Sequence, residues 1–334
     1  MSSMTKIAVW EMCMSSVLRL SSSSRGFKTS LDSCSSRLWA TSQSGLIKTP
    51  SSLWSKTTTR MKMQERLSLS TNWAPELLSR SNKCDEEDKN IENENGITSF
   101  HAACNNGCFK IVALMLQNTD LDINFNAKSK SYKTAFHLAC TEGHSDIVKI
   151  IMKNAAVLSI DLNTKHRLDG WTPFHSACHR GHSDVVKIVM ESALILKTDL
   201  NAKNERGITA FQWACVHGQA DVVKIIMENA VALSIDVNTK DDVGSTTLHW
   251  ACQRYSNSDV LKILMGYSLV LGIDINAKNK NGWTGFHWTT SLGCSDMAQI
   301  FMENAIALGI DLNAKDNYNV TGFHQACWRG YYDV

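Results

Sequence analysis

A threonine-centred segment recurs seven times along the chain at an almost constant spacing. The threonines are separated by 36, 38, 37, 37, 38 and 37 residues, and they are Thr98, Thr134, Thr172, Thr209, Thr246, Thr284 and Thr321. Around them the sequence reads ITSFHAAC, KTAFHLAC, WTPFHSAC, ITAFQWAC, STTLHWAC, WTGFHWTT and VTGFHQAC. A fixed period of about 20–50 residues is typical of stacked repeats, in which each unit buries its apolar face against its neighbours. The period therefore predicts a solenoid.

Each unit reads as a turn, a helix, a second turn and a second helix. In the third unit, Thr172 suits an N-cap, and Pro173 suits the first helical position, where its missing N–H is harmless. Phe174, Ala177 and Cys178 then fall on one helical face. Glycines are expected to end this first helix in the left-handed conformation, at Gly143, Gly181, Gly218 and Gly293. The second helix opens on an aspartate and is apolar enough to pack on both sides, as in DVVKIIM (221–227).

These units resemble ankyrin repeats. The third unit, GWTPFHSACHRGH (170–182), DVVKIVM (184–190) and DLNAKN (199–204), is similar to the family pattern G-x-T-P-L-H-x-A-A-x-x-G-H, V-V-x-L-L and D-V-N-A. The resemblance implies an all-α solenoid of stacked helix-turn-helix units with projecting hairpin-like loops. It places an array over residues 85–334, with repeats beginning near residues 96, 132, 170, 207, 244, 282 and 319.

Several departures from the family pattern carry structural predictions. About four extra residues, as in ENAVALSIDVN (228–238), predict a second helix one turn longer in the second to sixth repeats. Tyr255 stands where a glycine is expected and one residue is inserted, so the fifth repeat should be locally distorted. Tyr132 and Asn319 replace the loop glycine in the second and seventh repeats.

The first 84 residues lack this pattern. Residues 1–80 contain 20 serines, and they carry 11 Lys and Arg against 4 Asp and Glu. Such a composition buries too little apolar area to offset chain entropy, so we expect residues 1–84 to be disordered apart from a short helix over 73–82. An Arg- and Ser-rich, acid-poor start also fits a mitochondrial transit peptide, although no clear amphipathic helix accompanies it. A misassigned first exon is a further alternative.

Charge, hydropathy and cysteine content restrict which classes of protein the chain can belong to. From Gly96 onward the chain has 21 basic and 22 acidic side chains, a balance that argues against nucleic-acid binding. No apolar run reaches the roughly 18 residues that a membrane-spanning helix needs. Eleven cysteines in a long chain without a secretory signal indicate reduced thiols, and hence a cytoplasmic or nuclear location.

A histidine and a cysteine one helical turn apart recur in five of the seven repeats, as in His175 and Cys178. A metal site or a catalytic dyad is a single constellation, so repetition at one register favours packing. The resemblance implies that the histidine ties the Thr-x-x-His turn to neighbouring loops. His179 is interpreted as an outward-facing polar residue. We therefore expect no enzyme activity, metal, cofactor or small-molecule substrate.

The position after the histidine is tryptophan in three consecutive repeats, at Trp213, Trp250 and Trp288. In ankyrin stacks the first helix lines the inner, concave surface, so these residues form a candidate partner-binding stripe. The alternative is that the indoles fill space between adjacent helices, and packing is the favoured reading. Arg180, His217 and Arg254 occupy positions of the repeat close to those of the tryptophans, and the arginines could pair with acidic groups on a partner. These three residues complete the candidate partner-binding site.

Two further sets of polar residues lie in the turns. The loop lysines, among them Lys165, Lys203 and Lys278, are interleaved with acids and are interpreted as solvated. Asparagines in D-x-N motifs are expected to make hydrogen bonds within their turns. They are Asn163, Asn201, Asn238, Asn276 and Asn313.

The sequence thus favours a non-catalytic scaffold that binds another protein, still unidentified, through its concave face and loop tips. The alternative is a regulatory segment of a larger protein, such as an ion channel or a signalling enzyme. The seventh repeat ends at WRGYYDV, before a second helix, which favours the alternative.

Overall fold

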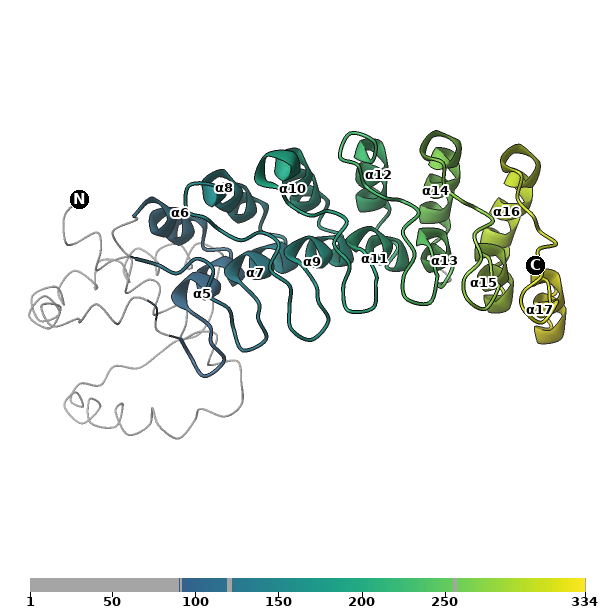
Figure 1. Ribbon diagram of the computed structural model, residues 1–334, viewed down its shortest axis with the longest axis horizontal. Helices are drawn as coiled ribbons and strands as arrows, with labels where there is room; N and C mark the ends of the chain where they lie inside the picture. Colours follow the sequence, from purple (N-terminus) through teal and green to yellow (C-terminus); the bar gives the residue numbers. More distant parts are fainter. Residues whose placement is uncertain (1–89, 91, 119–121, 255–256, 334) are drawn as a thin grey trace, which may run out of the picture.

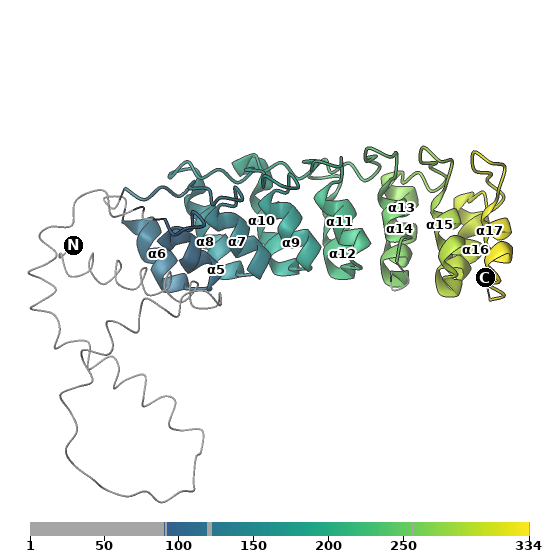
Figure 2. The same cartoon turned by 90° about the horizontal axis from the view of Figure 1, so that it is seen from below.

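The computed structural model describes residues 90, 92–118, 122–254 and 257–333. The predictions for residues 1–84, the short helix included, lie outside them. The described residues form two parallel rows of helices, and the long loops between repeats project on one side (Figures 1 and 2). The first helices of the repeats make the inner row: α5 (Ser99–Asn105), α7 (Ala135–Glu142), α9 (Pro173–Arg180), α11 (Ala210–Val216), α13 (Thr247–Ala251), α15 (Gly285–Leu292) and α17 (Gly322–Arg329). The second helices make the outer row: α6 (Phe109–Gln117), α8 (Ser145–Ala155), α10 (Ser183–Leu196), α12 (Ala220–Asn229), α14 (Ser258–Leu271) and α16 (Ser295–Leu308).

A capping box begins every first helix. The repeated threonine is the N-cap residue of all seven, and the side chain at N3 accepts its backbone N–H. In α9, His175 Nδ1 lies 3.2 Å from the backbone nitrogen of Thr172. The fourth repeat uses Gln212 instead, whose Oε1 lies 2.9 Å from the backbone nitrogen of Thr209. Two backbone N–H groups at the helix start, those of the N-cap and N3 residues, are therefore satisfied within one turn.

The same N3 side chains join each repeat to the next. His175 Nε2 lies 3.2 Å from the carbonyl oxygen of Ile208, and Gln212 Nε2 lies 3.4 Å from the equivalent carbonyl oxygen of Ser245. Gln212 Nε2 also donates to the carbonyl of Thr239, within its own repeat, at 2.7 Å. His101, His137, His249 and His287 make the equivalent contact with the following repeat. Because Nδ1 accepts a backbone N–H, Nε2 carries the proton of the neutral ring and donates it across the repeat boundary. The histidine thus has the inter-repeat role that the resemblance implied.

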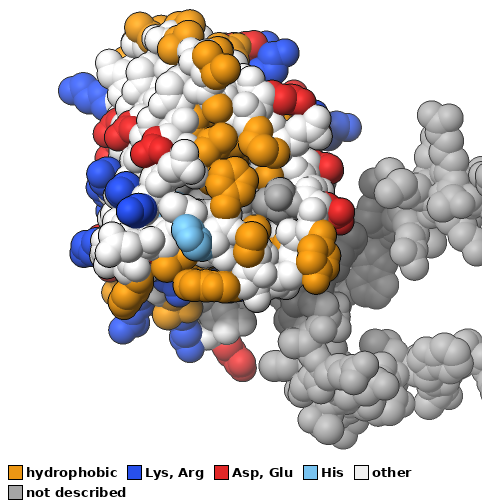
Figure 3. All heavy atoms as spheres, turned by 90° about the vertical axis from the view of Figure 1, so that its right-hand side faces the viewer, with side chains coloured by type: hydrophobic (Ala, Val, Ile, Leu, Met, Phe, Trp, Pro, Cys, Tyr) orange, Lys and Arg blue, Asp and Glu red, His pale blue; other side chains and the backbone are white. Residues whose placement is uncertain are grey.

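The hydrophobic core runs through the stack between the two rows. In α9, Phe174, Ala177 and Cys178 are buried, as the helical spacing predicts. In α12, Val222 and Ile226 are completely buried between α10 and α14. Burying an aliphatic side chain of this size contributes roughly 1.5–3 kcal/mol, so the stack holds together through many such contacts between neighbours. At the end beyond α16 and α17, apolar side chains gather on the surface (Figure 3).

The first helices end as the glycine pattern predicts, with one shift. Gly143, Gly181 and Gly293 are C-cap residues in the left-handed conformation. In α11 the C-cap is His217, and Gly218 adopts its positive φ of 67° one residue later. The chain therefore reverses at the same glycine after a slightly shorter helix.

The prediction of longer second helices is correct for three repeats and wrong for two. Helices α10, α14 and α16 have 14 residues, against 9 in α6. Helix α8 ends at Ala155 and α12 at Asn229, and the extra residues after them form turns. After α12, the N–H of Ala230 donates to the carbonyl of Met227, three residues back, which tightens the backbone and ends the regular helix.

The fifth repeat is distorted as predicted. Its first helix, α13, has only five residues, and Tyr255 lies outside the described residues. Asn257, which is 1 % exposed, bridges the distortion: its Nδ2 donates to the carbonyls of Cys215 and Val216 in the preceding repeat and to Ala251. Tyr132 and Asn319 adopt positive φ values of 64° and 59°, as expected at glycine positions.

The turns form a second ladder between repeats. Asn201 Nδ2 donates to the carbonyl of Ser234 at 2.9 Å, while its Oδ1 accepts the N–H of Asp236 at 3.0 Å. The expectation of hydrogen bonds inside the turn is wrong for the asparagine side chain, because the turn itself is closed by Asp199, whose Oδ1 accepts the N–H of Asn201. The loop lysines are not simply solvated either, since Lys203 Nζ donates to the carbonyl of Lys240 in the next repeat.

None of the described helices is both long and apolar enough to cross a membrane.

Candidate functional site

The three tryptophans of the stripe lie at the fourth position of α11, α13 and α15. Trp213, Trp250 and Trp288 are all half-buried. The Nε1 atom of each indole is buried and has no hydrogen-bond partner among the described residues. Each ring therefore packs its nitrogen edge inward and leaves part of its carbon surface exposed. The indoles thus fill space between neighbouring elements, and the exposed part of each ring is still open to contact.

Ring contacts divide the stripe into two groups. Trp213 stacks against Trp250 with ring centroids 6.4 Å apart, and Trp171 lies 5.0 Å from Trp213 on the other side. Trp288 instead contacts Trp283 at 4.9 Å, and among the described residues no ring contact joins it to Trp250. The structure thus brings Trp213 and Trp250 together and separates Trp288 from them.

Two histidines extend the first group. His179 lies with its ring centroid 4.2 Å from that of His217 and 4.9 Å from that of Trp171. His217 in turn stacks on Trp213 at 5.6 Å. We call the contiguous set Trp171, His179, Trp213, His217 and Trp250 the aromatic ridge.

The interpretation of His179 as a simple outward-facing polar residue is wrong. It lies outside the core, but it is half-buried because Trp171, Trp213 and His217 surround its ring. Sequence reasoning also missed Trp171, which directly precedes the N-cap Thr172. The signal was present, since Trp283 stands at the same place before Thr284 and contacts Trp288.

The charge of the ridge comes from arginine. Arg180 and Arg254 are exposed and border the ridge: Arg180 is the last residue of α9, and Arg254 follows shortly after the end of α13. Burial, the neighbouring His179 and Arg254 lower the pKa of His217 to about 4, and burial, Arg180 and Arg254 lower the pKa of His179. Both imidazoles are therefore neutral at pH 7, and the fixed positive charge is that of the guanidinium groups.

A small hollow of about 130 Å³ continues the ridge toward the second repeat. Its lining includes Trp171, Ser176, His179, Arg180 and Lys133. The hollow also contains a carboxylate, Asp169, but Asp169 Oδ1 lies 2.5 Å from His166 Nδ1 and is thus occupied within the loop. The free charges around the hollow are positive, so the electrostatic potential at this end of the ridge is attractive to acidic groups.

The repeated His and Cys residues have electrostatic properties opposite to those of an activated nucleophile. Burial lowers the pKa of His175 to about 4 and raises the pKa of the Cys178 thiol well above its usual range. An activated cysteine needs a lowered pKa, which requires an electropositive and partly exposed setting. Within the described part of the chain, no cluster of three or more His, Cys, Asp and Glu residues is placed to hold a metal ion.

Comparisons with known proteins agree with this architecture. A family model described as ankyrin repeats (3 copies) matches residues 71–165, 121–196, 156–241, 189–279 and 248–334. No curated protein matches the sequence. Among solved structures, the crystal structure of the ankyrin repeat domain of Bcl-3, a unique member of the IkappaB protein family, is similar with a TM-score of 0.59 and 22 % identity. The match covers 72 % of this chain and 98 % of that one. At this identity the likeness concerns the fold alone.

Proposed function

The chain belongs to the ankyrin repeat family, and we propose that it is a non-catalytic scaffold that binds a partner protein through the aromatic ridge and the loops beside it. The observation that carries the proposal is the contiguous contact of Trp171, His179, Trp213, His217 and Trp250 across three repeats. Tryptophan is enriched among residues that dominate binding energy, because it buries much area with few rotatable bonds.

The charges beside the ridge indicate the chemistry of the partner. Arg180 and Arg254 are exposed and make no salt bridge with any described residue. Partner carboxylates placed over the ridge would pair with these guanidinium groups, while apolar side chains would cover the exposed indole surface. We therefore propose an acidic partner segment that also carries apolar or aromatic side chains. The proposal is the same for an array that acts alone and for one that regulates a longer protein.

Charge reversal tests the proposal without disturbing the core. The full chain and the double variant Arg180→Glu/Arg254→Glu serve as baits in cell extract, and bound proteins are identified by mass spectrometry. The matched control is Lys187→Glu/Lys224→Glu, which makes the same charge change at exposed positions on α10 and α12. Because all four side chains are exposed, circular dichroism should show the same helix content in every bait.

A protein retained by the parent and by the control, but lost from the Arg180→Glu/Arg254→Glu bait, supports the ridge as the binding surface. A photo-crosslinking amino acid at position 217 should then link to that same protein, whereas one at position 187 should not. Equal retention by both charge-reversed baits contradicts the proposal and moves the interaction to another face.

A further inference from the structure

Exposed aliphatic side chains recur along the outer row of helices, whereas the aromatic ridge belongs to the inner row and its loops. They lie near the ends of α10, α14 and α16 and in the turn after α12, and each is at least 70 % exposed. We call this set the aliphatic stripe: Leu194, Ile195, Val231, Leu269, Val270 and Ile306. An exposed apolar surface that extends over several repeats indicates an interaction site.

The stripe comes from the extra residues of these repeats. Its members lie one or two positions after Ala193, Ala230, Ser268 and Ala305, within the additional residues by which the repeats exceed the family pattern. The core does not need them. In α10, for example, Val189 and Met190 already face the core and are buried, while Leu194 and Ile195 are exposed. The stripe is therefore open to a partner.

The spacing of the stripe matches the period of an α-helix. Helices α10, α12, α14 and α16 pack side by side in the outer row (Figure 1), so residues at one register of neighbouring repeats lie about 8–10 Å apart. Seven residues of an α-helix rise about 10.5 Å, so apolar residues at every seventh position would meet one repeat after another. Side chains on one face of a β-strand recur about every 6.7 Å and do not match. A helix of about 21 residues would span the four repeats.

Carboxylates border the stripe on both sides. Glu191, Glu228 and Glu303 are exposed, and each precedes a stripe residue by three positions, which is one helical turn. On the other side, an exposed aspartate follows a stripe residue by five positions in all four repeats, at Asp199, Asp236, Asp274 and Asp311. The borders thus hold seven acidic side chains, and Lys197 is the one basic residue of the sequence between them.

These carboxylates are free to meet a partner. None of them forms a salt bridge with a described residue. The aspartates accept N–H groups of their own turns, as Asp236 does from Asn238 at 2.9 Å, but they keep their negative charge. The lysines of the same helices, such as Lys187 and Lys224, precede the stripe by seven residues and lie about 10 Å farther along the helix. The potential at the stripe is therefore negative and attracts basic groups.

A hollow of about 470 Å³ opens beside the stripe, between α10 and α12. Its lining includes the apolar side chains of Met190, Ile225 and Leu233, and its three carboxylates outnumber the single ammonium of Lys187. The end of α12 and the turn after it form one wall, so the hollow continues directly into the stripe at Val231. A large apolar side chain of a helix that lies on the stripe would fit there.

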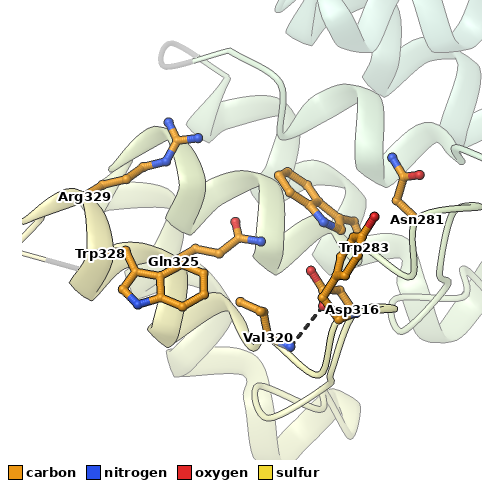
Figure 4. Close-up of a pocket in the computed structure, with 8 residues that line it drawn as sticks. Asn281, Trp283, Asp316, Val320, Gln325, Trp328 and Arg329 are labelled. Carbon is orange, nitrogen blue, oxygen red and sulfur yellow. Dashed lines mark hydrogen bonds between the residues drawn. The ribbon is translucent and has the colours of Figure 1, made fainter.

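The hollow between the sixth and seventh repeats has a different character. It measures about 550 Å³, and Trp283, Asp316 and Arg329 are among its lining residues (Figure 4). The carboxylate of Asp316 is occupied within its own loop, where Oδ1 accepts the N–H of Val320 at 3.0 Å, and Arg329 is exposed. This loop-side hollow therefore lacks the free negative charge that borders the stripe on the outer row.

We infer that the aliphatic stripe and the hollow beside it bind a basic amphipathic helix of a partner protein. Apolar side chains at every seventh position of that helix cover Ile195, Val231 and Val270, and one of them enters the hollow. Lysine and arginine side chains along its two edges pair with the glutamates and aspartates that border the stripe. This ligand has the opposite charge to the one proposed for the ridge, so the two surfaces select different partners.

Two other occupants fit the stripe less well. A second copy of the chain would bring its own acidic borders against those of the first, and like charges in contact are unfavourable. The anionic surface of a membrane would be repelled by the same carboxylates. A basic helix satisfies both the apolar stripe and its borders.

The test measures the binding of a labelled 21-residue helical peptide to the full chain by fluorescence anisotropy. The probe consists of three heptads with leucine at positions a and d and lysine at positions e and g. The matched probe has glutamate in place of every lysine. We expect the lysine probe to bind at least tenfold more tightly than the glutamate probe, and its affinity should fall as the salt concentration rises.

A first pair of variants tests the apolar contact. Ile195→Ser/Val231→Ser/Val270→Ser removes apolar surface from the stripe, and Leu168→Ser/Val243→Ser makes the same kind of change at exposed loop positions. All five side chains are exposed, so circular dichroism should show the helix content of the parent in both variants. The stripe variant should bind the lysine probe at least tenfold more weakly, and the loop variant should bind it within twofold of the parent.

A second pair tests the acidic border. Glu191→Gln/Glu228→Gln removes two carboxylates beside the stripe, and Glu142→Gln/Glu205→Gln removes two exposed carboxylates on the inner row and its loops. We expect the first to weaken binding of the lysine probe at least threefold and the second to change it by less than twofold.

The inference is overturned if the parent does not bind the lysine probe, if it binds both probes equally, or if the stripe and loop variants bind alike. Sedimentation velocity and flotation with phosphatidylcholine–phosphatidylserine vesicles test the other occupants. A parent that dimerises or floats, when the stripe variant does neither, would assign the stripe to a second copy or to lipid and would also overturn the inference. None of these results affects the ridge, whose charge-reversal test changes different residues.

Discussion

His175 Nε2 lies 3.2 Å from the carbonyl oxygen of Ile208, which belongs to the following repeat. The same imidazole accepts the N–H of Thr172 at the start of its own helix. One side chain therefore closes a helix and joins two repeats. The His and Cys pattern that suggests a chemical site in the sequence is explained by this repeated structural role.

Replacement of His175 by glutamine should leave stability nearly unchanged, because in the fourth repeat Gln212 accepts the N–H of Thr209 and donates to the carbonyl of Ser245. Replacement by alanine leaves the N–H of Thr172 unpaired and removes the bond to Ile208, whose carbonyl still accepts the N–H of Asn204, so it should cost about 2–4 kcal/mol. Urea unfolding at pH 7.5 measures both changes. Equal losses for His175→Gln and His175→Ala would contradict the assignment of the two hydrogen bonds.

Acid should destabilise the array below neutral pH. Burial lowers the pKa of His137 and of His175 to about 4 in the folded chain, whereas an unfolded histidine titrates near pH 6.5. The unfolded state thus binds protons first, and stability is lost as the pH falls from about 6.5 to 4, by roughly 3 kcal/mol for each histidine.

Urea unfolding at pH 7.5, 6 and 5 measures this dependence. The double variant His137→Gln/His175→Gln should show a shallower pH dependence than the parent, because it lacks two of the titrating groups. If parent and variant lose the same free energy of unfolding between pH 7.5 and 5, these histidines do not cause the effect.

Lys197→Gly should stabilise the chain. Lys197 ends α10 in the left-handed conformation with φ of 53°, and Gly272 and Gly309 hold the corresponding positions after α14 and α16. A side chain at such a position costs about 1 kcal/mol relative to glycine, which is partly offset by the greater freedom of glycine in the unfolded state. The thermal melting temperature should therefore rise for Lys197→Gly and fall for the reciprocal Gly272→Lys. Shifts in the same direction for both would refute the argument.

Asn201→Ala should lower the free energy of unfolding by about 1 kcal/mol. The substitution removes the hydrogen bonds that Asn201 makes with Ser234 and Asp236 of the next repeat, and these bonds lie at exposed sites. Asn313 offers the matched control. It stands in the same D-x-N motif, yet its side chain makes no hydrogen bond to any described residue. Asn313→Ala should thus change the free energy of unfolding by less than about 0.5 kcal/mol. Equal effects of the two substitutions would show that the inter-repeat bonds contribute little.

Thiol reactivity should differ sharply along the stack. Cys178 is fully buried with a raised pKa, whereas Cys327 at the equivalent position of the seventh repeat is exposed. Brief treatment of the native chain with iodoacetamide should modify Cys327 and leave Cys178 free, as measured by peptide mass spectrometry. Modification of Cys178 at a similar rate would mean that the third repeat opens readily.

The sequence predicts the repeat architecture well, because the constant period, the N-cap threonines and the helix-ending glycines are local features that recur from repeat to repeat. Thr172, Pro173 and Gly181 all have the roles that their positions predict. The sequence predicts only part of the candidate site. Trp213 and Trp250 share a register and do stack, but the contact of His179 with His217 joins different positions of adjacent repeats. Such diagonal contacts depend on the rotation between repeats, which no single repeat encodes.

The ends of the second helices show a further limit. The four additional residues are present in all five repeats from the second to the sixth, yet only α10, α14 and α16 extend through them. Ser159 and Ser234 still adopt positive φ at the position of Gly272, so the chain follows a similar course after α8 and α12. What differs is the regularity of the hydrogen bonds, and composition alone does not determine it.

The acceptor of each histidine bridge is a main-chain carbonyl, such as that of Ile208 or Trp283. Every amino acid supplies this group, so the junction between two repeats does not require a particular side chain from the incoming unit. A gene that gains or loses one whole unit by unequal crossing-over would therefore still encode satisfied junctions. Array length and the identity of the exposed residues are then free to diverge independently, which makes duplication a route to new recognition surfaces on an unchanged frame.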